Sequence, residues 1–269
     1  MRIAHLSDVH LIAPRSRRAT YRLRSRAVRF GRTNDPALRG KRLANALRCS
    51  IANGADHVVV SGDLTELGDE AEYELFAEVL SDARIDADRV TLIPGNHDAY
   101  SSAEGWKKAL AGPLAAWASA SARSGNEAAD VHVVDRGDVA FVPLDVTKHQ
   151  SFLWSGGELR RAAAERIDAI ARDPAFAKKP LVLVVHHPPF PKHDNAAYRY
   201  LDSLKGSELV YDLLDRHPHV HLLHGHFHKV LDRGRMFGAP GVADDGEDTP
   251  RVRIYDTNDA ALVSAGVCS

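Results

Sequence analysis

The most informative stretch for the fold is VTLIPGNHD, residues 90–98, in which an apolar, β-branched run leads directly into a turn of polar side chains. Such a run is typical of a buried strand, and the Pro-Gly pair after it predicts a sharp turn at the strand end. Asn96, His97 and Asp98 then present an amide, an imidazole and a carboxylate in succession. We therefore expect functional chemistry at the carboxyl end of this strand.

The same arrangement of strand and polar motif recurs along the chain. Further motifs follow apolar runs at Asp8-Val9-His10, Gly62-Asp63, His186-His187-Pro188-Pro189 and His224-Gly225-His226-Phe227-His228. We expect strands at residues 3–6, 57–61, 90–93, 131–134, 139–144, 181–185 and 220–223, and helices at residues 41–52, 69–82, 104–120, 158–171 and 207–216. Beyond residue 225, short segments without a helix predict antiparallel strands that close a sheet edge. The alternation predicts a layered α/β fold, in which ligands bind at the carboxyl ends of strands.

The polar motifs have the residue types and the spacing of metal ligands. In an extended chain, residues two apart point to the same side. Asp8 with His10, and His226 with His228, can therefore each approach one cation. The carboxylate of Asp63 has two oxygens and can bridge two cations.

Histidine is concentrated late in the chain, where nine of the 15 lie between residues 186 and 228. Imidazole is the commonest metal ligand of proteins. Taken alone, each motif has a plainer reading as a polar turn or a hydrogen-bonded core histidine. Five strand ends in succession favour a metal centre instead.

The composition is that of an ordinary folded protein, with 44% hydrophobic and 26% charged residues, and at 269 residues we expect a single domain over residues 1–269. No apolar run reaches the roughly 18 residues of a membrane span, and the first strand leaves no room for a signal peptide. We expect a cytoplasmic location. Cys49 and Cys268 are far apart and outside CxxC spacing, so we expect neither a disulfide framework nor a thiolate metal site.

Residues 15–42 form a basic segment that we expect to be a loop insertion. They hold 11 Lys or Arg and one acid, a local charge of +10 in a chain of net charge -1. Such a run is either a solvated face or a collar that attracts a polyanionic substrate, nucleic acid or an acidic membrane surface. The candidate substrate contacts are Arg17, Arg18, Arg22 and Arg24.

In order, the motifs DxH, GD, GNHD, HHPP and GHFH resemble the calcineurin-like binuclear metallophosphoesterase superfamily from Asp8 to His228. The resemblance implies a two-sheet β-sandwich flanked by helices, a four-layer αββα fold with two metal ions at the strand ends. It implies that Asp63 bridges the two ions. The implied ligand sets are Asp8, His10, Asp63 and His228 for one metal, and Asp63, Asn96, His186 and His226 for the other.

The resemblance also implies roles beside the metals. His97 corresponds to a histidine that contacts the phosphate and assists departure of the leaving group, whereas His187 corresponds to no ligand. We expect Asp98 to orient His97 or to hold it protonated. Glu66 stands where purple acid phosphatases carry a tyrosine ligand, which disfavours that branch.

Two cations about 3.5–4 Å apart can bind phosphoryl oxygens and lower the pKa of a shared water, which supplies hydroxide for in-line attack. Nitrogen and oxygen ligands suit Mn, Fe, Zn or Co, and the sequence does not choose among these metals.

The chain looks most similar to bacterial phosphodiesterases that act on cyclic nucleotides or glycerophosphodiesters, and we expect a phosphodiesterase. The basic segment keeps a second hypothesis open, a pyrophosphatase or phosphomonoesterase for a polyanionic nucleotide or lipid-linked substrate. A third hypothesis, a metal-free protein-binding scaffold, is disfavoured because all seven ligand positions carry ligand residues. The sequence indicates no protein partner and leaves the physiological substrate and oligomeric state open.

Overall fold

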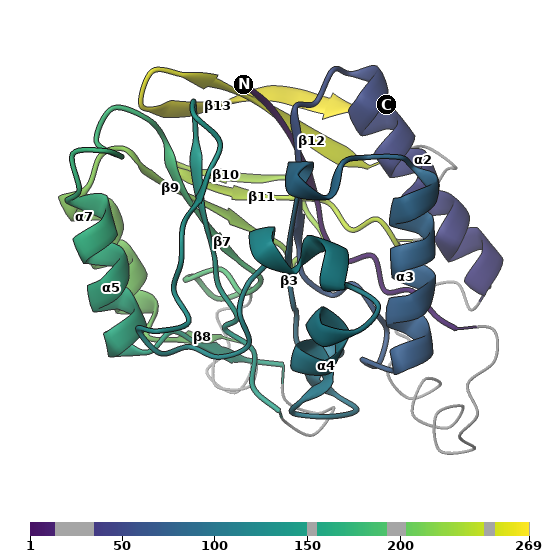
Figure 1. The fold of residues 1–269 in the computed structure, drawn as a ribbon. Coiled ribbons are helices and arrows are strands. Elements are labelled where there is room, and N and C mark those ends of the chain that lie inside the picture. Colours follow the sequence, from purple (N-terminus) through teal and green to yellow (C-terminus); the bar gives the residue numbers. More distant parts are fainter. Residues whose placement is uncertain (14–34, 150–154, 193–202, 245–250, 269) are drawn as a thin grey trace.

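The computed structural model describes residues 1–13, 35–149, 155–192, 203–244 and 251–268. Two sheets pack face to face, and helices cover the outer face of each sheet (Figure 1). This arrangement confirms the predicted α/β fold, a two-sheet sandwich flanked by helices.

The first sheet combines the N-terminal strands with the C-terminal hairpin. From edge to edge its strands are β13 (Ala261–Cys268), β12 (Val252–Asn258), β1 (Arg2–Leu6), β2 (His57–Ser61) and β3 (Val90–Ile93). Strands β1, β2 and β3 are parallel, and the antiparallel hairpin of β12 and β13 closes the edge as expected. Two helices pack on the outer face, α2 (Pro36–Ala52) and α3 (Glu70–Asp82).

The second sheet comes from the middle of the chain. From edge to edge its strands are β10 (Leu231–Arg233), β11 (Met236–Gly238), β9 (Val220–His224), β7 (Leu181–Val185), β5 (Ala140–Pro143) and β4 (Val134–Asp135). Its outer face is covered by α5 (Arg161–Ala171) and α7 (Ser207–Arg216). A separate pair, β6 (Gly157–Glu158) and β8 (Leu204–Lys205), lies beside them. Strand β11 pairs with β9 in parallel, whereas only antiparallel strands were expected after residue 225.

The strands are apolar on both faces because both faces are covered. Val58 and Val60 belong to the cluster under α2 and α3, whereas Val59 faces the second sheet. There it joins the cluster of Phe141 and Val182 between the sheets. Such double burial accounts for the continuous apolar runs of the sequence.

Two predicted elements of the middle region are wrong. The expected helix over 104–120 is interrupted, because α4 (Gly105–Ala111) ends before Gly112-Pro113 and a 3₁₀ helix follows at Ala115–Ala120. Proline lacks the N–H that the helix needs and disfavours helical backbone in the residue before it. The expected strand over 131–134 survives only at its last residue, where β4 begins.

Helix α2 begins at Pro36 rather than at Lys41, inside the segment expected to be a loop. The Asp35 side chain accepts hydrogen bonds from the N–H groups of Ala37 and Leu38, at 2.9 and 3.4 Å. Proline suits the first position of a helix, so the two residues together define this start. The rest of the basic segment lies outside the described residues, and with it Arg17, Arg18, Arg22 and Arg24.

The two cysteines form a disulfide, so the expectation of none is wrong. Cys49 lies in the last turn of α2 and Cys268 ends β13, with a Cα–Cα distance of 6.5 Å. Their separation of 219 residues hid this proximity, which arises because α2 packs under the β12–β13 edge. Among the described helices, none has both the length and the apolar composition needed to cross a membrane.

Candidate metal centre

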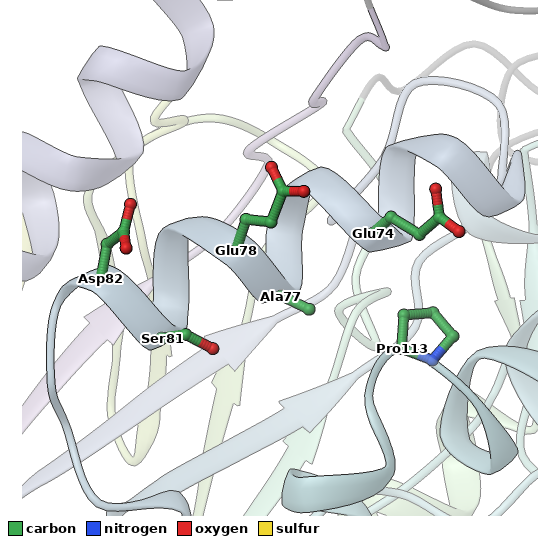
Figure 2. Close-up of a pocket in the computed structure, with 6 residues that line it drawn as sticks. All are labelled: Glu74, Ala77, Glu78, Ser81, Asp82 and Pro113. Carbon is green, nitrogen blue, oxygen red and sulfur yellow. The ribbon is translucent and has the colours of Figure 1, made fainter.

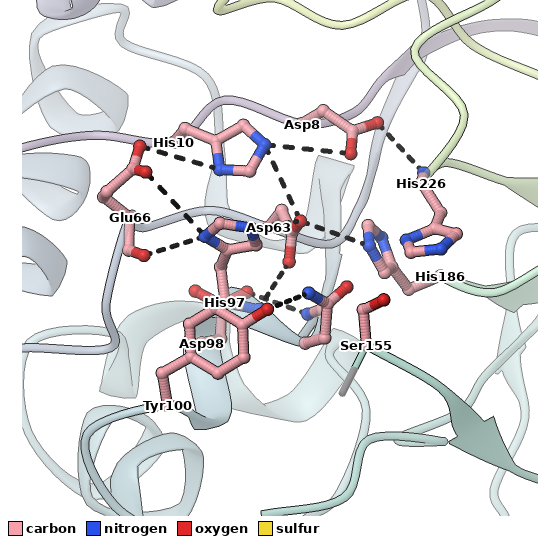
Figure 3. A network of polar contacts seen from close by, with 12 residues as sticks. Asp8, His10, Asp63, Glu66, His97, Asp98, Tyr100, Ser155, His186 and His226 are labelled. Carbon is pink, nitrogen blue, oxygen red and sulfur yellow. Dashed lines mark hydrogen bonds and ion pairs between the residues drawn. The ribbon is translucent and has the colours of Figure 1, made fainter. Parts of the chain in front are cut away.

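The carboxyl ends of strands from both sheets meet at one edge of the sandwich, where the polar motifs lie (Figure 3). The His10 N–H donates to the Asp63 carbonyl at 2.9 Å, which joins the first two motifs. The His226 N–H donates to Asp8 Oδ2 at 3.1 Å, across 218 residues of sequence. His186 Nδ1 donates to the Ser61 carbonyl at 2.8 Å and ties the second sheet to the first.

Asp63 lies in the middle of this cluster. Its Oδ2 is 3.3 Å from His186 Nε2, 3.6 Å from His10 Nε2 and 4.0 Å from His97 Nε2. Its Oδ1 accepts a hydrogen bond from the His97 N–H at 2.9 Å. The Asp63 carboxylate therefore faces imidazoles that come from both sheets.

Asp8 lies on the other side of His10. Its Oδ1 is 3.1 Å from His228 Nε2 and 4.0 Å from His10 Nε2. The ligand atoms of Asp8, His10 and His228 lie within 4.8 Å of one another, and so do those of Asp8, Asp63 and His186. These His and Asp groups can hold divalent metal ions.

Asn96 Oδ1 is a buried atom of the cluster with no hydrogen-bond partner among the described residues. The Tyr100 hydroxyl accepts a hydrogen bond from Asn96 Nδ2 at 2.8 Å, which holds the amide in one orientation. A buried polar atom without a partner costs about 1–3 kcal/mol and is rare in folded proteins. An amide oxygen is a type of atom that ligates metals, so the donor set fits a bound cation.

Two imidazoles are held through the nitrogen that faces away from the cluster. His186 Nδ1 donates to the Ser61 carbonyl, and His228 Nδ1 is paired with the Asp244 carboxylate. A proton on Nδ1 leaves the lone pair of Nε2 for a cation, and such partners fix the ring orientation. Asp244 therefore supports a candidate ligand, although it belongs to none of the sequence motifs.

Left-handed backbone is concentrated at the cluster. Five candidate ligands have positive φ angles, namely Asp8 (54°), His10 (49°), Asp63 (52°), His226 (68°) and His228 (56°). For residues other than glycine this conformation costs about 1–2 kcal/mol each. Such strain persists where the surroundings enforce it, typically at functional sites.

Two motif glycines allow the strand ends to pack this closely. A Cβ atom at Gly95 would lie 2.1 Å from Asp63 Oδ1, and one at Gly225 would lie 1.8 Å from Ser7 Oγ. Both distances are far shorter than any van der Waals contact. The glycines of the GNHD and GHFH motifs are therefore required by contact.

The carboxylates and imidazoles of the cluster shift each other's pKa values. Burial raises the pKa of Asp63. The neighbouring imidazoles, above all His186, lower that pKa by more than burial raises it, so the net shift is downward. Burial lowers the pKa of His186, and Asp63 more than compensates and raises it to about 9. The pKa of His228 likewise rises to about 10, because Asp8 and Asp244 outweigh burial. The cluster therefore favours positive charge, which a cation can supply.

Asp98 was expected to orient His97, but the two side chains have different hydrogen-bond partners. His97 Nδ1 donates to the Glu66 carbonyl at 2.8 Å. The Asp98 carboxylate instead accepts hydrogen bonds at 2.6–3.0 Å from Leu64 N–H, Thr65 N–H, Thr65 O–H and Gly95 N–H. It joins the GD loop to the GNHD loop, and burial together with Asp63 raises its pKa to about 7.

His187 packs against the second half of the cluster. Its ring centroid lies 4.6 Å from that of His226 and 5.0 Å from that of His186, and the three rings offer nitrogen atoms within 4.8 Å of one another. Its Nε2 contacts the Ser155 carbonyl. The exclusion of His187 from the ligand set stays a prediction.

A surface hollow elsewhere carries none of this chemistry. It lies along α3 (Figure 2) and is lined by Glu74, Ala77, Glu78, Ser81, Asp82 and Pro113. Its acidic lining would repel an anionic substrate, and it contains none of the predicted ligands.

The family model of the calcineurin-like phosphoesterases matches residues 1–230. A protein of Rhodopseudomonas palustris, described as a probable cyclic nucleotide phosphodiesterase, is 30% identical over 178 residues. That alignment covers 65% of this chain and 57% of the relative, so the chain matches little more than half of the relative's length.

Solved structures share the fold. A dimetal phosphatase from Danio rerio superposes with a TM-score of 0.67 at 14% identity, over 100% of this chain and 99% of that protein. A purple acid phosphatase from yellow lupin seeds superposes with a TM-score of 0.56 at 12% identity, over 98% of this chain and 51% of that protein. At these identities the likeness concerns the fold alone.

Proposed function

The chain belongs to the calcineurin-like phosphoesterase family, and on that premise we propose that it is a phosphoester hydrolase that works with two divalent metal ions. The position of Asp63 carries this proposal. Its Oδ2 lies 3.6 Å from His10 Nε2 of the first sheet and 3.3 Å from His186 Nε2 of the second. A carboxylate shared between two ligand sets is what a two-metal centre requires.

The ligands divide into two sets, Asp8, His10, Asp63 and His228, and Asp63, Asn96, His186 and His226. The unpartnered Asn96 Oδ1, and His186 Nε2 at 3.3 Å from Asp63 Oδ2, support the second set. When bound, the two ions bind the phosphoryl group and activate a water as the nucleophile. Mn, Fe, Zn and Co all suit these ligands.

His97 is the proposed catalytic residue. Its Nε2 faces the centre, 4.0 Å from Asp63 Oδ2, while its Nδ1 donates to the Glu66 carbonyl at 2.8 Å. The Tyr100 ring packs against it with a centroid distance of 4.7 Å. Held in this way, the protonated ring can contact a phosphoryl oxygen and donate the Nε2 proton to the leaving-group oxygen. Asp98 holds the GD and GNHD loops together and does not contact the reacting atoms.

We favour a phosphodiester as the substrate. The support is the resemblance to the Rhodopseudomonas palustris protein, whose description names cyclic nucleotides. The test is hydrolysis of bis(p-nitrophenyl) phosphate and of p-nitrophenyl phosphate after loading with Mn²⁺, Zn²⁺, Co²⁺ or Fe²⁺. We expect cleavage of the diester with at least one metal. Cleavage of the monoester alone would overturn the diester assignment and leave the hydrolase assignment standing.

A polyanionic substrate is the second candidate, carried by the local charge of +10 in residues 15–42. This hypothesis predicts that kcat/KM falls steeply with added salt, because salt screens long-range attraction. A flat salt profile would count against it. Exchange of Arg17, Arg18, Arg22 and Arg24 for alanine then locates the effect in the predicted loop insertion.

A further inference from the structure

Arg39 belongs by sequence to the basic segment, yet its side chain is fully buried, with 0% of its surface exposed. It lies in the first turns of α2, and its Nη1 donates to the carbonyl of His10 and to the carboxylate of Glu66. One guanidinium therefore contacts both the backbone of a candidate ligand and a second buried residue. It does not attract substrate from solution, because it does not reach solvent.

Glu66 connects this guanidinium to two imidazoles of the centre. Its carboxylate is also fully buried and lies 3.9 Å from His10 Nδ1 and 4.0 Å from His97 Nδ1 (Figure 3). Its carbonyl accepts the hydrogen bond from His97 Nδ1. The rings of His10 and His97 meet edge to face, with centroids 4.4 Å apart. A shift of Glu66 therefore moves both rings.

Two features make this a positioning device and not only a packing contact. His10 has a left-handed φ of 49°, and its carbonyl is one of the two groups that Arg39 holds. A buried ion pair adds little net stability over apolar residues, whereas removal of one partner leaves an unpaired buried charge. The pair is therefore better explained by the geometry that it imposes than by the free energy of folding.

We propose that Arg39 is a positioning residue of the metal centre, which holds His10 directly and, through Glu66, the pair His10 and His97. The proposal rests on the proposed function of the same site. Arg39 links helix α2 to the centre, so that the helix sets the orientation of the candidate ligand His10 and of the proposed catalytic residue His97.

The test compares Arg39→Met, Glu66→Gln and the double variant with the wild type. Three quantities are measured: the Kd for Mn²⁺, kcat and KM for bis(p-nitrophenyl) phosphate, and Tm in the presence of EDTA. Each single variant should lower Tm and weaken metal binding about 10- to 100-fold, the usual effect of losing a residue that supports a metal ligand. KM should change less than kcat.

The double variant separates positioning from stability. It buries no unpaired charge, so its Tm in EDTA should recover toward that of the wild type. Its metal affinity and kcat should stay reduced, because the Arg39 guanidinium then no longer holds the His10 carbonyl or the side chain at position 66. Arg39→Lys should restore part of the metal affinity, since lysine keeps the charge but lacks the forked donors. Should Arg39→Met not fold, the double variant carries the test.

Asp168→Asn is the matched control. Asp168 is 5% exposed, and its carboxylate is paired with Arg216 and with His217 Nε2, the latter at 2.8 Å. His217 precedes β9, so this ion pair lies at the amino end of the strand, opposite the metal centre. The control should lose Tm but keep wild-type metal affinity and kcat. Wild-type metal affinity and kcat in the folded double variant would overturn the proposal. A wild type that binds no metal would overturn the proposed function instead.

Discussion

Buried histidines between the sheets and buried histidines at the carboxyl ends of the strands have different surroundings. Between the sheets, burial lowers the pKa of His57 to about 3 and that of His221 to about 4. At the strand ends burial acts in the same direction, yet the pKa of His186 is about 9 and that of His228 about 10. At His186 and His228, neighbouring carboxylates outweigh burial, whereas at His224 burial still lowers the pKa to about 4.

The difference separates a structural histidine from a candidate metal ligand. His57 Nε2 is bonded to the Thr91 hydroxyl at 2.9 Å, and its ring stacks on Phe141 with centroids 4.7 Å apart. A neutral ring satisfies that environment. His186 instead directs Nε2 toward Asp63 and gives Nδ1 to a carbonyl. Burial alone therefore does not mark a candidate ligand, whereas Nε2 of His186 faces a carboxylate that other candidate ligands also face.

The largest effect is expected at the carboxylate that the strand-end histidines share. Asp63→Asn keeps the shape of the side chain but removes the charge. Hydrolysis of bis(p-nitrophenyl) phosphate by metal-loaded protein should fall at least about 10⁴-fold, because enzymes owe accelerations of 10⁶ or more to their intact centres. Steady-state rates on matched metal-loaded samples measure this loss. Retention of a tenth of the activity would contradict the bridging role.

His97→Ala tests whether chemistry at the strand ends can be separated from metal binding. We expect kcat to fall about 10²-fold or more, the usual contribution of a general acid, with the metal content unchanged. The missing proton donor matters less when the leaving group is already acidic. The loss should therefore shrink for a p-nitrophenyl ester relative to an alkyl ester. Equal losses for both esters would exclude a role in leaving-group protonation.

Asp244→Asn tests the support of a single strand-end ligand. The Asp244 carboxylate pairs with His228 Nδ1, and loss of such a partner weakens metal binding about 10- to 100-fold. Titration with Mn²⁺ should show one weakened site beside one of wild-type affinity. Weakening of both sites to the same degree would argue against the assignment of His228 to one ion.

His57→Gln tests the region between the sheets and should have the smallest effect. The pKa of His57 in the folded state, about 3, lies below its unfolded value near 6.5. Its contribution to stability is thus complete above pH 6.5 and is lost as the pH falls toward 3. Between pH 6.5 and 3, the free energy of unfolding of His57→Gln should change by roughly 1–3 kcal/mol less than that of the wild type. Denaturant unfolding at several pH values measures this, and metal affinity should not change.

The sequence was informative where a motif sits directly at a strand end. Asp8, Asp63 and His186 follow predicted strands, and the structure brings them within ligand distance of one another. Supporting residues escaped prediction because their partners are distant. Asp244 follows His228 by 16 residues with no regular spacing, and Arg39 reaches from α2 to Glu66 in the loop before α3.

Two errors have related physical causes. Asp98 follows His97 directly, but a neighbour in sequence points elsewhere when the chain turns into a 3₁₀ helix, as it does at His97–Ala99. The basic segment was expected to be a solvated face or a collar for a polyanion, whereas its Arg39 is buried on α2. Local composition does not show which face of a helix a residue occupies.

The number of metal ions per chain tests the central claim most directly. Wild type, Asp63→Asn and His57→Gln are loaded with Mn²⁺ or Zn²⁺, freed of excess ions and measured by plasma mass spectrometry. We predict two ions per chain in the wild type and in His57→Gln, and fewer than one in Asp63→Asn. Two ions retained by Asp63→Asn, or none bound by the wild type with either metal, would contradict a centre bridged by Asp63.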